Sequence, residues 1–522
     1  MSRQTEEIPL VAFRLNFSSG TPLYKQLYEL IQNAILEGKF LKGQKLPSTR
    51  SLASELKISR NTVSLAFEQL LIEGYITGKI GSGTFVSEIP DNFFKFRIEP
   101  KVNPAEREKI KSVTSSRLQS DDKMPFLKQT LFEKLNKQVK SNELIKRYTK
   151  KDEVIPFQNG IPAFSEFPVK IWQKLINQTM QNFSNLQLGY GEAAGFKPLR
   201  EAIASYLGAY RAVNCNADQI IIVNGTQQGL DLIGRILLKP GSAVWIEDPG
   251  YFGARAAMIF AGAEIFPSPL DNEGLDLDYS SRNNPKPSLI FTTPSHQFPL
   301  GLTMSISRRL NLLRYASENK CWIVEDDYDS EFRYSGSPLP SLQGLDKDKR
   351  VLYIGTFSKV LFPGLRLGYL VLPDPGMVDE FVSVKSLIDR QNPIFEQIVL
   401  AKFIEGGYFT QHLRKMRMLY KAKQEFLIDE IKRELKGMVN AEPHSAGMHI
   451  IAWMPKKIAD IKIANEALKN NIIVRPLSEY SIKFSKKPGL LLGYTAFDKN
   501  QIRKGIMELK KVLSRVIPDA QV

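Results

Sequence analysis

Cysteine and histidine are scarce in this sequence. Its 522 residues include two cysteines, Cys215 and Cys321, and four histidines. The two cysteines lie far apart and belong to no CxxC or Cys/His pattern, so the sequence predicts neither a disulfide framework nor a structural zinc site. We therefore expect a protein of the reducing cytoplasm that binds no metal.

A long hydrophobic run is also missing. No stretch of about 18 apolar residues occurs. The N-terminal residues MSRQTEEIPLVAFRLNF carry early charges and no long apolar segment. Neither export nor membrane insertion is expected, and a membrane is not an expected partner.

Hydrophobic residues are plentiful, at 43% of the chain, and its length predicts two to four globular domains. Lysine and arginine number 71 against 55 aspartates and glutamates, which gives a formal net charge of +16. This charge permits nucleic-acid binding without requiring it, because the solvated surfaces of many proteins are also basic.

The first ninety residues combine helical spacing with residues that can cap helices. Apolar side chains in residues 22–37 repeat at helical intervals, which predicts one amphipathic helix. Ser48 can cap a second helix that ends near Leu56, and Ser59 can cap a third. Two helices joined by such a short turn predict a helix-turn-helix.

The second helix of a helix-turn-helix presents its first side chains to the DNA major groove. Those side chains are Arg60, Asn61 and Thr62. Residues 74–86 read as two short strands around a glycine-rich tip, a wing in which Lys79 and backbone amides can contact phosphates. The alternative is a small helical cap on a larger enzyme, in which the polar residues only cap helices.

The whole run resembles the winged helix-turn-helix of the GntR family of bacterial regulators. The pattern PSxRxLAxxLxxSRxTVxxAxxxLxxxG occurs in residues 47–74, and GxGTFV occurs in residues 81–86. The resemblance implies that residues 1–90 form a domain that binds double-stranded DNA. The residues that it implies at the DNA are Arg50, Ser59, Arg60, Thr62, Lys79 and Gly83.

Residues 91–155 are predicted to be a basic linker. Residues 91–153 contain sixteen basic and ten acidic side chains, and their periodicity is weak. A helix or two is possible in residues 124–147, so the linker is expected to be partly helical.

Residues 156–522 alternate strand-length apolar runs with helical patterns. This alternation predicts an α/β fold, with a mostly parallel sheet covered by helices on both faces. The expected strands are residues 219–223, 243–246, 288–291, 321–324, 351–354 and 367–371. Ligands gather at the carboxyl ends of such strands, and each run ends in a polar cluster.

The first two clusters suit a flat, phosphorylated ligand. Gly225, Thr226 and Gln227 precede a helical stretch and can offer backbone amides to a phosphate. Tyr251 follows the second run and can stack on a flat ring. Taken alone, each also suits an ordinary role, as a glycine turn into a helix or as a packed aromatic residue.

The next two clusters offer partners for ring heteroatoms. His296 or Gln297 can donate to a ring oxygen, although a lone histidine is more often an ordinary loop or core residue. Residues 325–328 read Glu-Asp-Asp-Tyr. One carboxylate can pair with a protonated ring nitrogen, and Tyr328 can donate to a ring hydroxyl; metal sites and helix caps are the alternatives.

Lys359 lies in residues 351–371, between two apolar runs and among small hydroxyl residues. A lysine in apolar surroundings has a lowered pKa, which suits an imine with an aldehyde cofactor. Thr356, Ser358 and Arg366 suit that cofactor's phosphate. The alternative is a surface lysine on a loop.

Together these clusters supply what pyridoxal phosphate requires, and their order resembles that of the fold-type I aminotransferases. The resemblance covers residues 156–522 and implies that Lys359 forms the internal aldimine and that Asp326 pairs with the pyridine nitrogen. Glu325 and Asp327 are the alternatives for the latter role. The resemblance further implies a ring-hydroxyl contact by Tyr328, stacking by Tyr251, phosphate contacts by Gly225, Thr226, Gln227, Thr356, Ser358 and Arg366, and a contact of Tyr190 with a neighbouring subunit's phosphate.

Two departures from the aminotransferase pattern stand out. Aminotransferases commonly carry an arginine for the substrate α-carboxylate where residues 490–494 read LLLGY, so Arg475 is a weak substitute for effector binding. The Asn-Pro-x-Gly turn of those enzymes is here Phe298-Pro-Leu-Gly, so His296 or Gln297 would have to bind the ring oxygen.

A GntR-type winged helix joined to an aminotransferase-like domain resembles the MocR subfamily. The resemblance implies a homodimeric transcription regulator that senses pyridoxal phosphate or its aldimine with an amino compound. An active aminotransferase with an accessory DNA-binding domain is the alternative, and a cofactor-free fold is a third possibility. The missing arginine counts against regular turnover.

Overall fold

The computed structural model describes residues 15–17, 19, 21–36, 38–41, 43–79, 83–87, 156–336, 339–455, 458–484 and 487–516. The predicted linker, with its possible helix in residues 124–147, lies outside these residues. The predicted domain boundaries at residues 90 and 155 also fall outside them and stay predictions. The chain divides into two compact units, residues 1–126 with 337–339, and residues 127–336 with 340–522.

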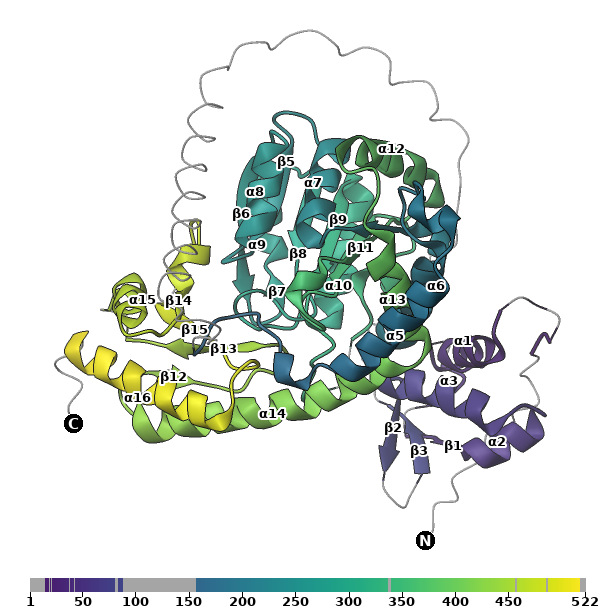
Figure 1. The fold of residues 1–522 in the computed structure, drawn as a ribbon, viewed down its shortest axis with the longest axis horizontal. Helices are drawn as coiled ribbons and strands as arrows, with labels where there is room; N and C mark the ends of the chain where they lie inside the picture. Colours follow the sequence, from purple (N-terminus) through teal and green to yellow (C-terminus); the bar gives the residue numbers. More distant parts are fainter. Residues whose placement is uncertain are drawn as a thin grey trace. The chain divides into compact units, whose positions relative to one another are not determined.

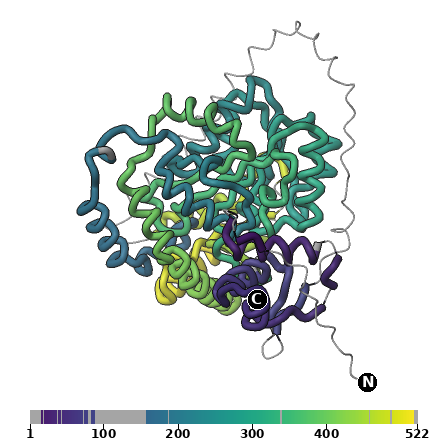
Figure 2. The backbone as a smooth tube through the Cα atoms, turned by 90° about the vertical axis from the view of Figure 1, so that its right-hand side faces the viewer, coloured from purple at the N-terminus to yellow at the C-terminus, as the bar shows by residue number. Residues whose placement is uncertain are grey.

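The first unit is a winged helix. Its helices are α1 (Leu23–Leu36), α2 (Thr49–Glu55) and α3 (Arg60–Ile72), which form the purple group in Figure 2. Its strands are β1 (Lys45–Leu46), β2 (Ile76–Lys79) and β3 (Gly83–Val86), in the antiparallel order β1-β3-β2. The expected helices and wing are therefore present.

The capping residues begin these helices as their chemistry predicts. The Ser48 hydroxyl accepts a hydrogen bond from the Ser51 amide at 3.1 Å, and the Ser59 hydroxyl accepts one from the Thr62 amide at 3.0 Å. Leu27, Leu52 and Val63 pack in the shared core of the unit. Helix α3 is thereby held against α1 and α2.

In its described part, the second unit is organised around an eight-stranded sheet in the order β4-β11-β10-β9-β8-β5-β6-β7. The strands are β4 (Ile220–Val223), β5 (Ala243–Asp248), β6 (Glu264–Asp271), β7 (Gly274–Leu275), β8 (Leu289–Thr292), β9 (Trp322–Asp327), β10 (Val351–Thr356) and β11 (Gly368–Val371). The pairs from β10 through β9, β8 and β5 to β6 are parallel, as expected. Strand β11 is antiparallel to both of its neighbours.

Helices cover both faces of this sheet (Figure 1). They include α5 (Val169–Gln181), α6 (Lys197–Arg211), α7 (Thr226–Leu237), α8 (Phe252–Phe260), α9 (Leu277–Asn283), α10 (Ile306–Asn319), α11 (Leu342–Leu345), α12 (Val378–Ile388) and α13 (Ile394–Glu405). Ile221 and Ile354 pack in a cluster with α7 and α8, whereas Ile222 and Tyr353 pack in the opposite cluster with α6. The strands are apolar on both faces for this reason.

A smaller antiparallel sheet follows, in the order β12-β13-β15-β14. Its strands are β12 (Asn440–Ala441), β13 (His449–Trp453), β14 (Arg475–Pro476) and β15 (Gly489–Gly493), and its helices are α14 (Tyr408–Glu434), α15 (Asp460–Lys469) and α16 (Lys499–Val516). Figure 1 shows α14 and α16 running along one side of this sheet. None of the helices in the described ranges is both long and apolar enough to cross a membrane.

Candidate functional site

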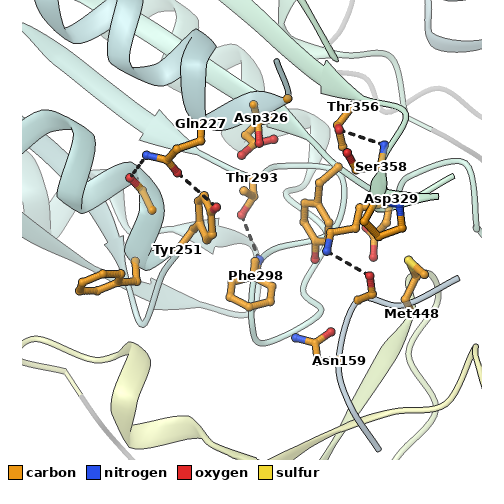
Figure 3. Close-up of a pocket in the computed structure, with 18 of the residues that line it drawn as sticks. Asn159, Gln227, Tyr251, Thr293, Phe298, Asp326, Asp329, Thr356, Ser358 and Met448 are labelled. Atoms are coloured by element: carbon orange, nitrogen blue, oxygen red, sulfur yellow. Dashed lines mark hydrogen bonds between the residues drawn. The ribbon is translucent and has the colours of Figure 1, made fainter. Parts of the chain in front are cut away.

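A cavity of about 640 Å³ lies in the second unit, where loops leave β4, β9 and β10. Figure 3 shows Gln227, Tyr251, Asp326 and Ser358 around a common space. Ten residues expected from the sequence line it: Gly225, Thr226, Gln227, Tyr251, Asp326, Tyr328, Thr356, Ser358, Lys359 and Arg366. The carboxyl ends of the strands bring these distant segments together.

Lys359 follows β10 and reaches into this cavity. Its Nζ donates a hydrogen bond to the carbonyl oxygen of Gly160 at 3.1 Å. Burial lowers the pKa of Lys359, although the nearby Asp329 and Asp326 act in the opposite direction. A lowered pKa increases the fraction of neutral amine, which is the nucleophilic form.

The three adjacent carboxylates of β9 have different surroundings. Glu325 accepts hydrogen bonds from the amides of Leu342 and Gln343 at 3.1 and 2.9 Å. Asp327 accepts one from Arg211 at 2.8 Å. Both carboxylates are therefore engaged away from the cavity, since neither is among its lining residues.

Of the three β9 carboxylates, Asp326 is the one that lines the cavity. Its Oδ1 is buried and has no hydrogen-bond partner. Burial, followed by the charges of Asp327, Asp329 and Glu247, raises the pKa of Asp326 to about 8. A cationic partner in the cavity would favour the ionised form of Asp326, so the site fits a protonated pyridine nitrogen.

Tyr328 lies beside this carboxylate and contacts His296. The Tyr328 hydroxyl is 2.9 Å from Nδ1 of His296, and the same nitrogen is 3.0 Å from Oδ1 of Asp329. His296 is buried but is not among the residues that line the cavity. His296 therefore contacts Tyr328 rather than the cavity, and its predicted contact with a ring oxygen stays a prediction.

Gln297 differs from expectation in the same way. Its amide nitrogen donates to the carbonyl oxygen of Pro249 at 3.0 Å, and its Oε1 accepts from the Leu300 amide at 3.0 Å. These bonds hold the side chain inside the loop, and it does not line the cavity. Phe298 lines the cavity instead and meets the Tyr251 ring edge to face, with centroids 6.1 Å apart.

The end of the cavity at the N-terminus of α7 suits a phosphate. Gly225, with φ +78°, precedes the first turn of α7, where Thr226 and Gln227 have no earlier helical carbonyls to bind. Arg366 donates to the Asn224 carbonyl oxygen at 2.9 Å, and the buried Ser358 hydroxyl has no hydrogen-bond partner. A helix N-terminus, a guanidinium and an unsatisfied hydroxyl fit a dianion.

Several lining residues were missed by the sequence reasoning: Asn159, Gly160, Thr293, Asp329, Met448, His449 and Tyr480. Asp329 closely follows the three carboxylates of β9 and was open to prediction from that position. Thr293 directly follows β8, and the others lie in segments without a recognised motif.

Tyr190 and Arg475 also lie outside this cavity. Tyr190 is 78% exposed, and the guanidinium carbon of Arg390 lies 3.9 Å from its ring centroid. Arg475 begins β14 and is half-buried. Neither is among the lining residues, so their predicted roles require a second subunit or another arrangement of the chain.

The residues expected at DNA lie in α2, at the start of α3 and in the strands β2 and β3. Arg50, Ser59, Arg60 and Asn61 are exposed, and the Thr62 hydroxyl is 2.8 Å from that of Ser59. Gly83 begins β3 with φ +111°, which favours glycine. The Lys79 side chain lies outside the described parts.

Known protein families match both units. The description "Bacterial regulatory proteins, gntR family" matches residues 23–86, and "Aminotransferase class I and II" matches residues 152–502. The probable rhizopine catabolism regulatory protein MocR of Rhizobium meliloti is 36% identical over 95% of this chain and 94% of its own length. The HTH-type transcriptional regulator TauR of Rhodobacter capsulatus is 31% identical over 81% of this chain and 83% of its own.

Solved structures match the second unit. The kynurenine aminotransferase of Pyrococcus horikoshii has a TM-score of 0.65 and 31% identity, over 73% of this chain and 95% of its own. Another match is LysN, an α-aminoadipate aminotransferase of Thermus thermophilus complexed with N-(5'-phosphopyridoxyl)-L-leucine. It has a TM-score of 0.65 and 27% identity, over 70% of this chain and 93% of its own. With a pyridoxal phosphate-type cavity joined to a DNA-binding winged helix, the chain belongs to the MocR subfamily of GntR-family transcription regulators.

Proposed function

We propose that the chain regulates transcription in the cytoplasm by holding pyridoxal phosphate at Lys359 and capturing an amino compound there. The observation that carries this proposal is the buried Lys359 amine, which shares one cavity with the unpartnered Oδ1 of Asp326. The same chain carries a winged helix with exposed polar side chains at the start of α3. Capture and DNA reading are thus linked in one polypeptide.

The lining residues that were expected from the sequence have roles in this proposal. Bound pyridoxal phosphate supplies an aldehyde and a ring that withdraws electrons while its nitrogen stays protonated. Asp326 would keep that nitrogen protonated, and Tyr328 would donate to the ring hydroxyl. Thr226, Ser358 and Arg366 would hold the phosphate, with Gly225, Gln227 and Thr356 beside them.

We further propose that the functional form is a homodimer. An exposed apolar patch consists of Leu188, Tyr190, Leu387 and Ile388, and Leu387 is 88% exposed. The two segments of this patch are joined by the Arg390 contact with Tyr190. Contiguous exposed apolar surface of this kind marks interaction sites, and a partner covering it would bring Tyr190 to a neighbouring subunit.

This apolar patch is connected to the phosphate end of the cavity. Asp389, directly after Ile388, accepts hydrogen bonds from the Asn224 side chain at 2.9 Å and from the Gln228 side chain at 2.7 Å. The backbone carbonyl of the same Asn224 accepts from Arg366. A change at the cofactor phosphate would therefore reach the surface at which subunits meet.

The proposal is tested by reduction with borohydride followed by peptide mass mapping, together with DNA binding. We expect the cofactor to be trapped on Lys359, and Lys359→Ala to lose both the trapped adduct and the response of DNA binding to amines. Lys421→Ala, at an exposed position of α14, is the control and should retain both. Trapping at other lysines only would contradict the proposal, and rapid turnover with no change in DNA affinity would favour the enzyme alternative.

The dimer is tested separately by sedimentation of the cofactor-loaded protein. Leu387→Asp should dissociate it, whereas Met418→Asp, at another exposed apolar position, should not. A monomeric wild-type protein would contradict the dimer.

A further inference from the structure

The part of the cavity left after the cofactor roles are assigned defines where an effector would lie. We call five of its residues the effector wall: Asn159, Phe298, Met448, His449 and Tyr480, all of which line the cavity. Figure 3 shows Asn159, Phe298 and Met448 on the side of the cavity away from Gln227. These residues come from three separate regions of the chain, around residues 159, 298 and 448–480.

None of the five residues of the effector wall carries a positive charge. Lys359 and Arg366 are the cationic side chains in that lining, and both serve the cofactor in the proposed function. Burial, aided by the charge of His296, lowers the pKa of His449 to about 3, so its ring is neutral. Its Nε2 lies 2.9 Å from the Pro299 carbonyl oxygen, where it can only donate.

The wall is instead aromatic. The Phe298 ring meets Tyr480, His449 and Tyr328 with centroid separations of 5.1, 5.6 and 5.9 Å. Met448 is almost fully buried beside them. Such surroundings favour an apolar or aromatic body.

Two positions could supply a carboxylate-binding arginine to the effector wall, and neither places one in the cavity lining. Leu490, Leu491 and Leu492 of β15 are fully buried in the core, where aminotransferases commonly carry the carboxylate-binding arginine. Arg475 is paired in register with Leu491 and does not line the cavity. Asp326 and Asp329 are the acidic side chains among the described residues that line the same cavity.

We propose that the effector is a primary amine with an uncharged, aromatic or apolar body and no carboxylate. The inference rests on the proposed function, because the amine must be captured at Lys359. A carboxylate would be desolvated against the wall without a cationic partner, which is costly. An amine without that group loses nothing there and gains contacts with Phe298, Met448 and Tyr480.

Matched probes separate the two ligand classes. The cofactor-loaded protein is titrated with 2-phenylethylamine and phenylalanine, and with tyramine and tyrosine, while absorbance, melting temperature and DNA affinity are followed. We expect each amine to reach half-saturation at a concentration at least about 10-fold lower than its amino acid, a difference of roughly 1.4 kcal/mol. Equal or tighter binding of the amino acids would overturn the inference.

Failure of the proposed function has a different signature. If borohydride traps no cofactor on Lys359, the proposed function fails, whatever the probes do. If Lys359 holds the cofactor and none of the four probes changes the absorbance, the inference about the ligand class is wrong while the proposed function stands.

A variant that adds a positive charge tests the wall directly. Asn159 is half-buried, so the larger side chain of Asn159→Arg can reach solvent and the variant should fold. We expect this variant to shift the ratio of half-saturation concentrations towards the amino acid by about 10-fold or more. Asn182→Arg, at the exposed end of α5, is the control and should keep the wild-type preference. An unchanged preference in folded Asn159→Arg protein would count against the inference.

Discussion

The hydroxyl group of Tyr328 lies 2.9 Å from Nδ1 of His296, and this nitrogen also lies 3.0 Å from Oδ1 of Asp329. A carboxylate accepts hydrogen bonds, so the proton between His296 and Asp329 belongs on Nδ1. The Tyr328 oxygen then faces a donor, and its own hydrogen is free to point into the cavity. We therefore infer that His296 positions the Tyr328 hydroxyl.

We predict that His296→Leu weakens cofactor binding by about 10-fold and shifts the pH at which cofactor absorbance changes, because the Tyr328 hydroxyl loses its fixed direction. The loss of one hydrogen bond of roughly 1 to 1.5 kcal/mol sets this magnitude. Tyr328→Phe should have a similar effect, and the double variant should lose little more than either single one. Additive losses would show that His296 acts independently of Tyr328.

A second prediction concerns Gly160, whose φ is +73° and whose carbonyl accepts the Lys359 hydrogen bond. A Cβ at this position would lie 2.5 Å from Lys359 Nζ. Gly160→Ala should therefore displace the amine and reduce borohydride trapping several-fold. The change in φ preference alone costs about 1 kcal/mol.

Gly241→Ala is a matched control for this substitution. Gly241 has φ +81°, and an added Cβ would meet nothing within 4 Å. It should therefore lower the melting temperature without changing the trapping yield. An equal loss of trapping in both variants would assign the effect to general destabilisation.

The strand-end chemistry of this site was predictable because parallel strands bring their carboxyl ends to one edge of a sheet. The choice among Glu325, Asp326 and Asp327 was only half predictable. Side chains alternate across a strand, so Asp326 must point away from its two neighbours. Which face borders the cavity depends on packing partners such as Arg211 and Leu342, which lie far away in sequence.

The effector wall could not be predicted from the sequence for a similar reason. Asn159, Met448 and Tyr480 lie in segments without a motif and meet only after the two sheets of the second unit pack together. Gln297 does not line the cavity as predicted, because its loop turns the side chain back to bind Pro249 and Leu300. Local patterns carry no information on that turn.

A third prediction follows from the raised pKa of Asp326. Its pKa is about 8 in the folded chain and 3.8 as an unperturbed side chain, with burial as the main cause. The protonated form is thus favoured by folding. The contribution of Asp326 to the free energy of unfolding of the cofactor-free protein is complete below about pH 4. This contribution is lost as the pH rises to about 8.

Asp326→Asn removes this dependence. The increase in melting temperature of the cofactor-free variant over wild type should be larger at pH 8.5 than at pH 6. The affinity of the variant for the cofactor should fall. Asp374→Asn, at an exposed position paired with Lys349, is the control and should leave the profile between pH 6 and 8.5 unchanged. Identical profiles for wild type and Asp326→Asn would contradict the raised pKa.

The last prediction concerns Arg60, the exposed first residue of α3 behind the Ser59 cap. If its guanidinium meets DNA, Arg60→Ala should weaken binding and reduce the slope of affinity against salt by about one. Arg60→Lys keeps the charge but loses the planar fork that binds a guanine edge. Retained affinity with lost sequence preference in Arg60→Lys would assign base reading to this residue, full retention would assign a phosphate contact, and an unaffected Arg60→Ala would remove it from the DNA interface.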